Sequence, residues 1–202
     1  MMFPANLRCF SSANGEAQLA IFGLMSEVWV VTGIARLIHA LFLMLTSRRD
    51  YILRIIDEVS RLLARVIFKR RSSEQEDALQ AIVQACERLF ALEADRLFQF
   101  TPDQHFVMLT EGQEPEIGRD KVLLYAALNT EAGHVYSKMG NSSMARASYL
   151  NALRFALRAR AEFPAGNLPA YAPSLAVLRE ALADAPLDPA TAEMLKAAEL
   201  HS

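Results

Sequence analysis

Apolar residues recur every three or four positions through most of this chain, the spacing that places them on one face of an α-helix. The clearest stripe lies within residues 48–71, and a second one follows before residue 91. Further helices are expected over about 101–110, 119–139, 143–162, 174–185 and 189–200. The first stripe consists of Ile52, Ile55, Ile56, Val59, Leu62, Leu63, Val66 and Ile67; the second of Ala78, Leu79, Ile82, Val83, Ala85, Cys86, Leu89 and Phe90.

Capping residues and turn residues mark several of the expected helix ends. Ser72 or Ser73 is expected to cap the second helix, because Glu76 follows Ser73 at the spacing of a capping box. Thr101 followed by Pro102 is typical of a helix start. Further signals are a polar loop over 111–116, a glycine stop at Gly140 before Asn141, and Asp188 as the cap of the last helix.

Composition supports an all-helical fold. The chain has 32 Ala and 28 Leu but only 19 Val and Ile together, and β-branched residues lose more side-chain entropy than Ala or Leu in a helix. This ratio argues against a β-sandwich, a barrel and a parallel α/β sheet. A net charge of −2 gives no general support for nucleic-acid binding. The two cysteines, 77 positions apart, form neither a disulfide framework nor a metal motif, so a cytoplasmic location is expected.

The first part of the chain has a different character. Residues 17–45 are apolar on nearly all sides, but Glu27 and Arg36 interrupt them and make a membrane span unfavourable. Three interpretations stay open: an extra helix that is buried or partner-bound, an interfacial anchor, or sequence upstream of a native start at Met44. We therefore divide the chain into an apolar extension over 1–43, a helical domain over 44–163, and proline-punctuated helices over 164–202 that pack on it.

One stretch carries a repeat signature of small and aromatic residues, in which small side chains let two helices cross closely. It resembles the tetratricopeptide repeat, a helix–turn–helix unit of about 34 residues. Asn129 stands at the repeat's tryptophan position and Leu157 at its closing proline position. A partial echo over 78–85 lies 67 residues upstream, close to two periods. The matching residues are Gly133, Tyr136, Gly140, Ala145, Tyr149 and Ala152.

Residues 44–163 also resemble a bacterial family of unknown function with a tetratricopeptide-like fold. The resemblance is carried by the opening DYILRIID over 50–57, by LLAR over 62–65, and by Ala145 with YLNAL over 149–153. It implies antiparallel helical hairpins in a short α–α superhelix and no activity. It also supports Met44 as the native start.

Candidate chemistry in the sequence is sparse. Glu131 and His134 have the spacing of a helical di-iron motif, but such sites need two of these motifs. Asp103, His105 and Glu111 surround the expected short helix without a motif-placed nucleophile. No glycine pattern for phosphate or dinucleotide binding occurs, and Cys86 belongs to an apolar stripe. We therefore predict no enzyme activity, no cofactor and no metal.

The preferred interpretation is a protein- or peptide-binding scaffold. In tetratricopeptide stacks, the first helix of each repeat lines a concave surface, which in this chain implies Thr130, His134, Ser137 and Lys138. A structural homo-oligomer is the alternative, and a homodimer is predicted because few repeats leave apolar faces uncovered. A third reading is a basic patch that binds nucleic acid or a membrane surface, centred on Arg65, Lys69, Arg70 and Arg71. Other membrane contact is expected only through residues 17–45.

Overall fold

A computed structural model describes residues 48–163, 166–183 and 186–200 of this chain. Two compact units are present, Met1–Asp50 and Tyr51–Ser202. Of the first unit, only the helical residues 48–50 are described, so the expected extension over 1–43 and its apolar segment lie outside the described residues. Every regular element in the described ranges is a helix, without a strand, which confirms the all-α prediction. No helix in these ranges is long and apolar enough to cross a membrane.

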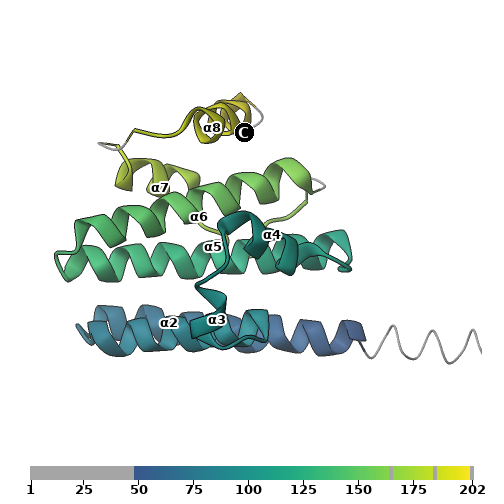
Figure 1. Ribbon diagram of the computed structural model, residues 1–202, viewed down its shortest axis with the longest axis horizontal. Helices are drawn as coiled ribbons and strands as arrows, with labels where there is room; N and C mark the ends of the chain where they lie inside the picture. The colour runs from purple at the N-terminus through teal and green to yellow at the C-terminus, as the bar shows by residue number, and fades with distance from the viewer. Residues whose placement is uncertain (1–47, 164–165, 184–185, 201–202) are drawn as a thin grey trace, which may run out of the picture. The chain divides into compact units, whose positions relative to one another are not determined.

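The second unit consists of three successive groups of helices (Figure 1). Helix 51–71 and α2 form the first group, α5 and α6 form a long central hairpin, and α7 and α8 both pack on α6. Two shorter helices, α3 and α4, connect α2 to α5, and α4 packs on α5. The bounds are α2 Gln75–Phe90, α3 Ala94–Leu97, α4 Pro102–Thr110, α5 Pro115–Lys138, α6 Ser142–Glu162, α7 Leu175–Ala181 and α8 Pro189–Leu200.

Two hydrophobic clusters hold these helices together. The larger cluster joins helix 51–71, α2, α4, α5 and α6, and it contains Val59 and Val66 from the first predicted stripe, both fully buried. The smaller cluster lies between α6, α7 and α8, with Leu153, Leu178 and Leu195 among its members. The 3.6-residue periodicity therefore identified the buried faces of the first two helices correctly.

The predicted serine cap of α2 is wrong. Glu74 occupies the N-cap position without a side-chain hydrogen bond, and Ser73 has a left-handed backbone with φ of 63°. The Glu74 amide donates to the carbonyl of Lys69 at 3.1 Å. This bond and the left-handed Ser73 are the signature of a helix C-terminus. The serines therefore end helix 51–71 instead of opening the next helix.

Other helix bounds also differ from those expected. The predicted start of the long helix near Arg119 is wrong, because α5 begins at Pro115, a residue whose ring suits the first helical position. Helix α7 ends at Ala181 instead of 185, and the short α3 was not expected. The other caps agree with prediction. Thr101 forms a capping box with Gln104, and Asp188 Oδ1 accepts from the amide of Thr191 at 3.1 Å.

Candidate functional site

The α5–α6 hairpin contains the residues of the predicted repeat signature. Gly133 of α5 lies directly under the ring of Tyr149 of α6, where a Cβ atom would come within 2.5 Å of the ring. Ala145 and Ala152 are buried on the same side of α6. Gly140 has a φ of 76° in the turn between the helices, a conformation that glycine adopts without strain. The small residues thus let the two helices approach closely.

A groove runs between helix 51–71 and α5, and we call it the α5 groove. Its volume is about 420 Å³, and its surface is mostly apolar. The segment that leads into α7 closes one side, and Tyr171 of this segment donates a hydrogen bond to the carbonyl of Asp120 at 3.4 Å. The lining residues are Ser60, Leu63, Ala64 and Ile67 of helix 51–71, Ala127, Thr130 and Glu131 of α5, and Ala170, Tyr171 and Pro173.

One end of the α5 groove is polar. Arg70 Nε donates to Glu131 Oε2 at 2.6 Å, and both side chains are largely buried. Lys138 Nζ donates to the carbonyl of Arg70 at 2.9 Å, so Lys138 and the exposed Arg71 lie at the same end. The charges of Arg70 and Glu131 balance each other, and Lys138 and Arg71 are two further cations close to this pair.

The four residues predicted to line a partner-binding groove have different surroundings. Thr130 lines the α5 groove, but its hydroxyl donates to the carbonyl of Ala126 at 2.9 Å. His134 lies one turn further along α5, where its Nδ1 is 2.8 Å from the Tyr149 hydroxyl. Lys138 contacts helix 51–71 as described above, and Ser137 is exposed. Of the four predicted residues, Thr130 lines the α5 groove, whereas His134, Ser137 and Lys138 are not part of its lining.

His134 has a perturbed ionisation. Desolvation lowers the pKa of its imidazole from the ordinary value of 6.5; the Glu131 carboxylate opposes this shift, whereas Arg70 and Lys138 add to it. Burial, followed by the charge of Glu131, raises the pKa of the neighbouring Tyr149 hydroxyl. Both shifts favour the uncharged form, so the contact between these rings is a neutral one near pH 7.

Asp103 and His105 of α4 have structural partners. Asp103 pairs with Arg158 at 2.8 Å. His105 is buried, with Nε2 2.9 Å from the carbonyl of Leu97 and Nδ1 3.2 Å from the Tyr125 hydroxyl. In the described ranges, no group of three or more His, Cys, Asp or Glu side chains could hold a metal ion. Burial raises the pKa of the Cys86 thiol to about 12, which makes it a poor nucleophile.

Sequence reasoning missed the half of the groove that helix 51–71 contributes. Ser60 and Ala64 are four residues apart, the spacing of neighbours on one helix face, and this was the available signal. The proline pair around Tyr171 was the signal for the segment that closes the groove.

Comparisons with known proteins add no relative: no family model, no curated protein and no solved structure matches this chain.

Proposed function

We propose that this chain is a non-enzymatic helical-repeat module that binds a segment of a partner protein in the α5 groove. The observation that carries the proposal is the groove itself, since it leaves apolar surface open to solvent between two long helices. Ala64 and Ala170 in its lining are exposed, and Ser60, Ile67 and Tyr171 are half-buried. A bound segment would remove this surface from water. A cytoplasmic location, expected from the widely spaced cysteines, is part of the proposal.

The packing order of the helices supports a tetratricopeptide-like interpretation. Helix α2 packs on α5, and α6 packs on α7, so the second helix of one pair contacts the first helix of the next. This is the order in stacked helical hairpins, whose first helices line a shared concave surface. The α5 groove lies between two such first helices, helix 51–71 and α5.

The lining favours an extended, apolar segment with an acidic residue at one end. Ser60, Ala64 and Ala127 are small, so the backbone of a bound segment could approach the groove closely. At the polar end, Lys138 and Arg71 would attract a carboxylate. We infer a partner segment in which apolar side chains precede or follow Asp or Glu.

Two other functions from the sequence are less well supported. In the basic-patch interpretation, Lys69 is already paired with Glu74 and Asp77, at 3.2 and 2.7 Å, and Arg70 is paired with Glu131. The homo-oligomer has a specific observation in its favour, because the Phe68 side chain is 68% exposed. Light scattering over a hundredfold dilution tests the homo-oligomer against the peptide-binding proposal. A dimer that Phe68→Ser converts to a monomer would assign helix 51–71 to self-association.

Selection from a random displayed peptide library tests the peptide-binding proposal on the full chain. Peptides enriched on the wild-type protein are measured by fluorescence polarisation against Ala64→Trp, which fills the groove from an exposed lining position. The matched control is Arg65→Trp, the next residue along the helix, which is exposed and does not line the groove. We expect at least a tenfold loss of affinity in Ala64→Trp and little change in Arg65→Trp.

Two outcomes would contradict the proposal. One is that no peptide is enriched. The other is that enriched peptides bind Ala64→Trp as tightly as wild type, which would put their site elsewhere. Circular dichroism of both variants confirms that they fold before the affinities are compared.

A further inference from the structure

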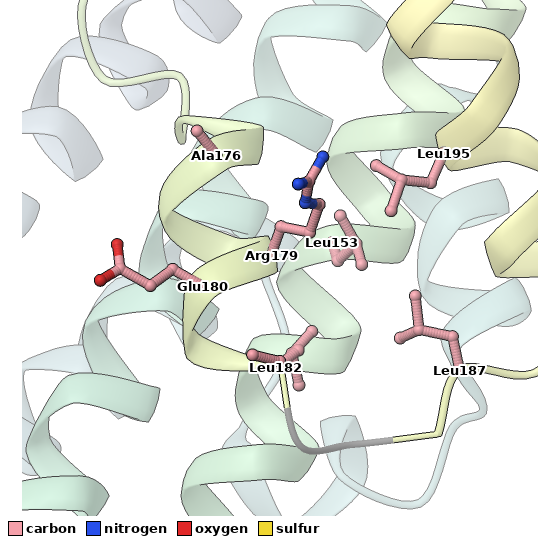
Figure 2. Close-up of a pocket in the computed structure, with 8 residues that line it drawn as sticks. Leu153, Ala176, Arg179, Glu180, Leu182, Leu187 and Leu195 are labelled. Atoms are coloured by element: carbon pink, nitrogen blue, oxygen red, sulfur yellow. The ribbon is translucent and has the colours of Figure 1, made fainter.

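Two surfaces outside the α5 groove leave apolar side chains open to solvent. One is a hollow of about 570 Å³ between α6, α7 and α8, where leucines of these helices and of the residues between α7 and α8 gather (Figure 2). The cation in its lining, Arg179, already interacts with another group, so the hollow offers no available charge to orient a ligand. The other surface is the side of helix 51–71 that faces solvent, and it does carry available charges.

This side of helix 51–71 combines exposed apolar side chains with exposed arginines. Phe68 is 68% exposed, and Tyr51 and Leu53 near the other end of the helix are 50% and 45% exposed. Helical rise puts roughly 25 Å between the two aromatic residues. Arg65 and Arg71 are each three residues from Phe68, so they flank it on the helix surface. We call this surface the outer face, and its residues are Tyr51, Leu53, Arg54, Arg65, Phe68 and Arg71.

The positive charge of the outer face is not compensated within the helix. Both acids of helix 51–71 are already neutralised, because Asp57 pairs with Arg61 and Glu58 pairs with Arg88 of α2. The three arginines of the outer face have no hydrogen-bond or ion-pair partner among the residues that the structure describes. The surface differs from the basic patch expected from the sequence, since the two paired cations of that patch are not part of it.

Arginines around exposed apolar side chains match the surface of an anionic membrane. Its head groups attract the cations, and its interior takes up the apolar side chains. A second copy of the chain fits less well, because a two-fold contact centred on Phe68 would bring the arginines of both copies together. A nucleic acid would satisfy the arginines, but it offers stacked bases and no apolar interior for Leu53.

We propose that the outer face of helix 51–71 binds the surface of a membrane that contains anionic lipids. The arginines contact the lipid phosphates, and Phe68 and Tyr51 insert between the head groups. Exposed charges are screened by salt, so the binding is reversible and weakens as ionic strength rises. The outer face includes none of the lining residues of the α5 groove, so this proposal is independent of peptide binding.

Sedimentation of the full chain with lipid vesicles tests the charges. We expect binding to vesicles of phosphatidylglycerol and phosphatidylcholine in equal parts, and much weaker binding to phosphatidylcholine alone. Arg65→Gln/Arg71→Gln should weaken binding to the anionic vesicles by about tenfold. The matched control is Arg96→Gln/Arg146→Gln, which removes two exposed arginines of α3 and α6 and changes the net charge equally. The control should bind like the wild-type chain.

A second pair of variants tests the insertion of Phe68. Phe68→Ser should weaken binding to the anionic vesicles by about tenfold, because a buried phenyl ring is lost. Phe98→Ser, at a position that is 60% exposed beside α3, should leave binding unchanged. Insertion is also measured directly by fluorescence, after Trp29→Phe has removed the tryptophan of the wild-type chain. Brominated lipids should then quench a tryptophan introduced by Phe68→Trp, but not one introduced by Phe98→Trp.

Several results would overturn the proposal, once circular dichroism has shown that the variants fold. Equal binding of the Arg65/Arg71 variant and its control would put the membrane contact elsewhere in the chain, as would a tryptophan at 68 that brominated lipids do not quench. A dimer that Phe68→Ser converts to a monomer in light scattering would assign the outer face to a second copy. Binding of single-stranded RNA, but not of vesicles, that the Arg65/Arg71 variant loses would assign it to nucleic acid.

Discussion

Gly133 of α5 packs against the aromatic ring of Tyr149 of α6 where the two helices cross. The nearest ring atom, Tyr149 Cε1, would lie 2.5 Å from a Cβ atom built on Gly133, which is closer than non-bonded carbons approach. Position 133 therefore has room for hydrogen and for nothing larger. The tyrosine ring, in turn, is held over the backbone of α5 and reaches His134 with its hydroxyl.

Gly133→Ala should destabilise the protein, although alanine is the better helix former. In a helix, alanine is favoured over glycine by about 1 kcal/mol because glycine loses more backbone freedom on folding. The collision with the Tyr149 ring forces a shift of one helix against the other, and overpacking of this kind costs about 1–3 kcal/mol. We expect a net loss in the free energy of unfolding, measured by urea denaturation.

Gly118→Ala in the same helix is the control, and it should raise the free energy of unfolding instead of lowering it. A Cβ atom there would meet Phe163 Cε1 at 3.4 Å, an ordinary contact, so this variant should gain up to about 1 kcal/mol. In the double variant Gly133→Ala/Tyr149→Ala, the cost of the alanine at 133 should largely disappear. Equal effects of alanine at 118 and 133 would mean that the hairpin does not cross at Gly133.

Protonation of His134 should lower stability. Its pKa is lower in the folded chain than the ordinary value of 6.5, first because of burial and then because of Arg70 and Lys138, against the opposing charge of Glu131. The unfolded chain therefore binds more protons between the two pKa values, so the free energy of unfolding falls as pH drops below about 6.5. His134→Gln should flatten this part of the pH profile. A profile with the same slope in wild type and variant would contradict the prediction. So would an NMR titration that gives His134 a pKa above 6.5.

Much of the fold follows from local sequence signals. The α5–α6 hairpin was predicted to within one residue at its turn, because Gly140 and Asn141 fix the conformation there. The close crossing was predicted from the spacing of small residues around Gly133 and Ala145. Both the turn and the crossing depend on residues that are close together in the sequence, so the spacing of small residues is enough to predict them.

The candidate groove could be predicted only in part. Thr130 was assigned to it from the repeat register, but Ser60 and Tyr171 come from segments 70 residues before and 41 residues after it. Their contact depends on how whole helices pack, which periodicity does not encode. For the same reason, the Arg70–Glu131 pair was not foreseen, and the serine turn before α2 was misassigned.

Loss of the Asp188 carboxylate should loosen α8. Hydrogen bonds from Arg154, at 2.7 Å, and from Thr191 lower the pKa of Asp188 from its ordinary value of 3.8. The stabilisation by the Asp188 carboxylate is therefore present above pH 3.8, and it is lost as the pH falls from there through the lower pKa of the folded chain. Asp188→Asn should speed hydrogen exchange of the α8 amides at neutral pH. Glu193→Gln, an equal charge change at an exposed position of α8, should not; equal exchange in both variants would show that the Arg154 contact does not hold the helix.

Ala145 and Ala147 of α6 offer a direct test of the small-residue requirement. Ala145 is buried against the smaller cluster with Tyr149, whereas Ala147, two residues later, is exposed. Leucine has nearly the helix propensity of alanine, so propensity contributes little at either position.

Ala145→Leu should lower the free energy of unfolding by about 1–3 kcal/mol, because three extra carbon atoms must fit where two helices and the Tyr149 ring already pack. Ala147→Leu should change it by less than about 0.5 kcal/mol, as expected of a surface substitution. Urea denaturation measures both values, and an unchanged slope with denaturant shows that the effect is on the native state. Equal stability of the two variants would mean that α6 does not present Ala145 to the crossing, and the resemblance to the repeat signature would be coincidental.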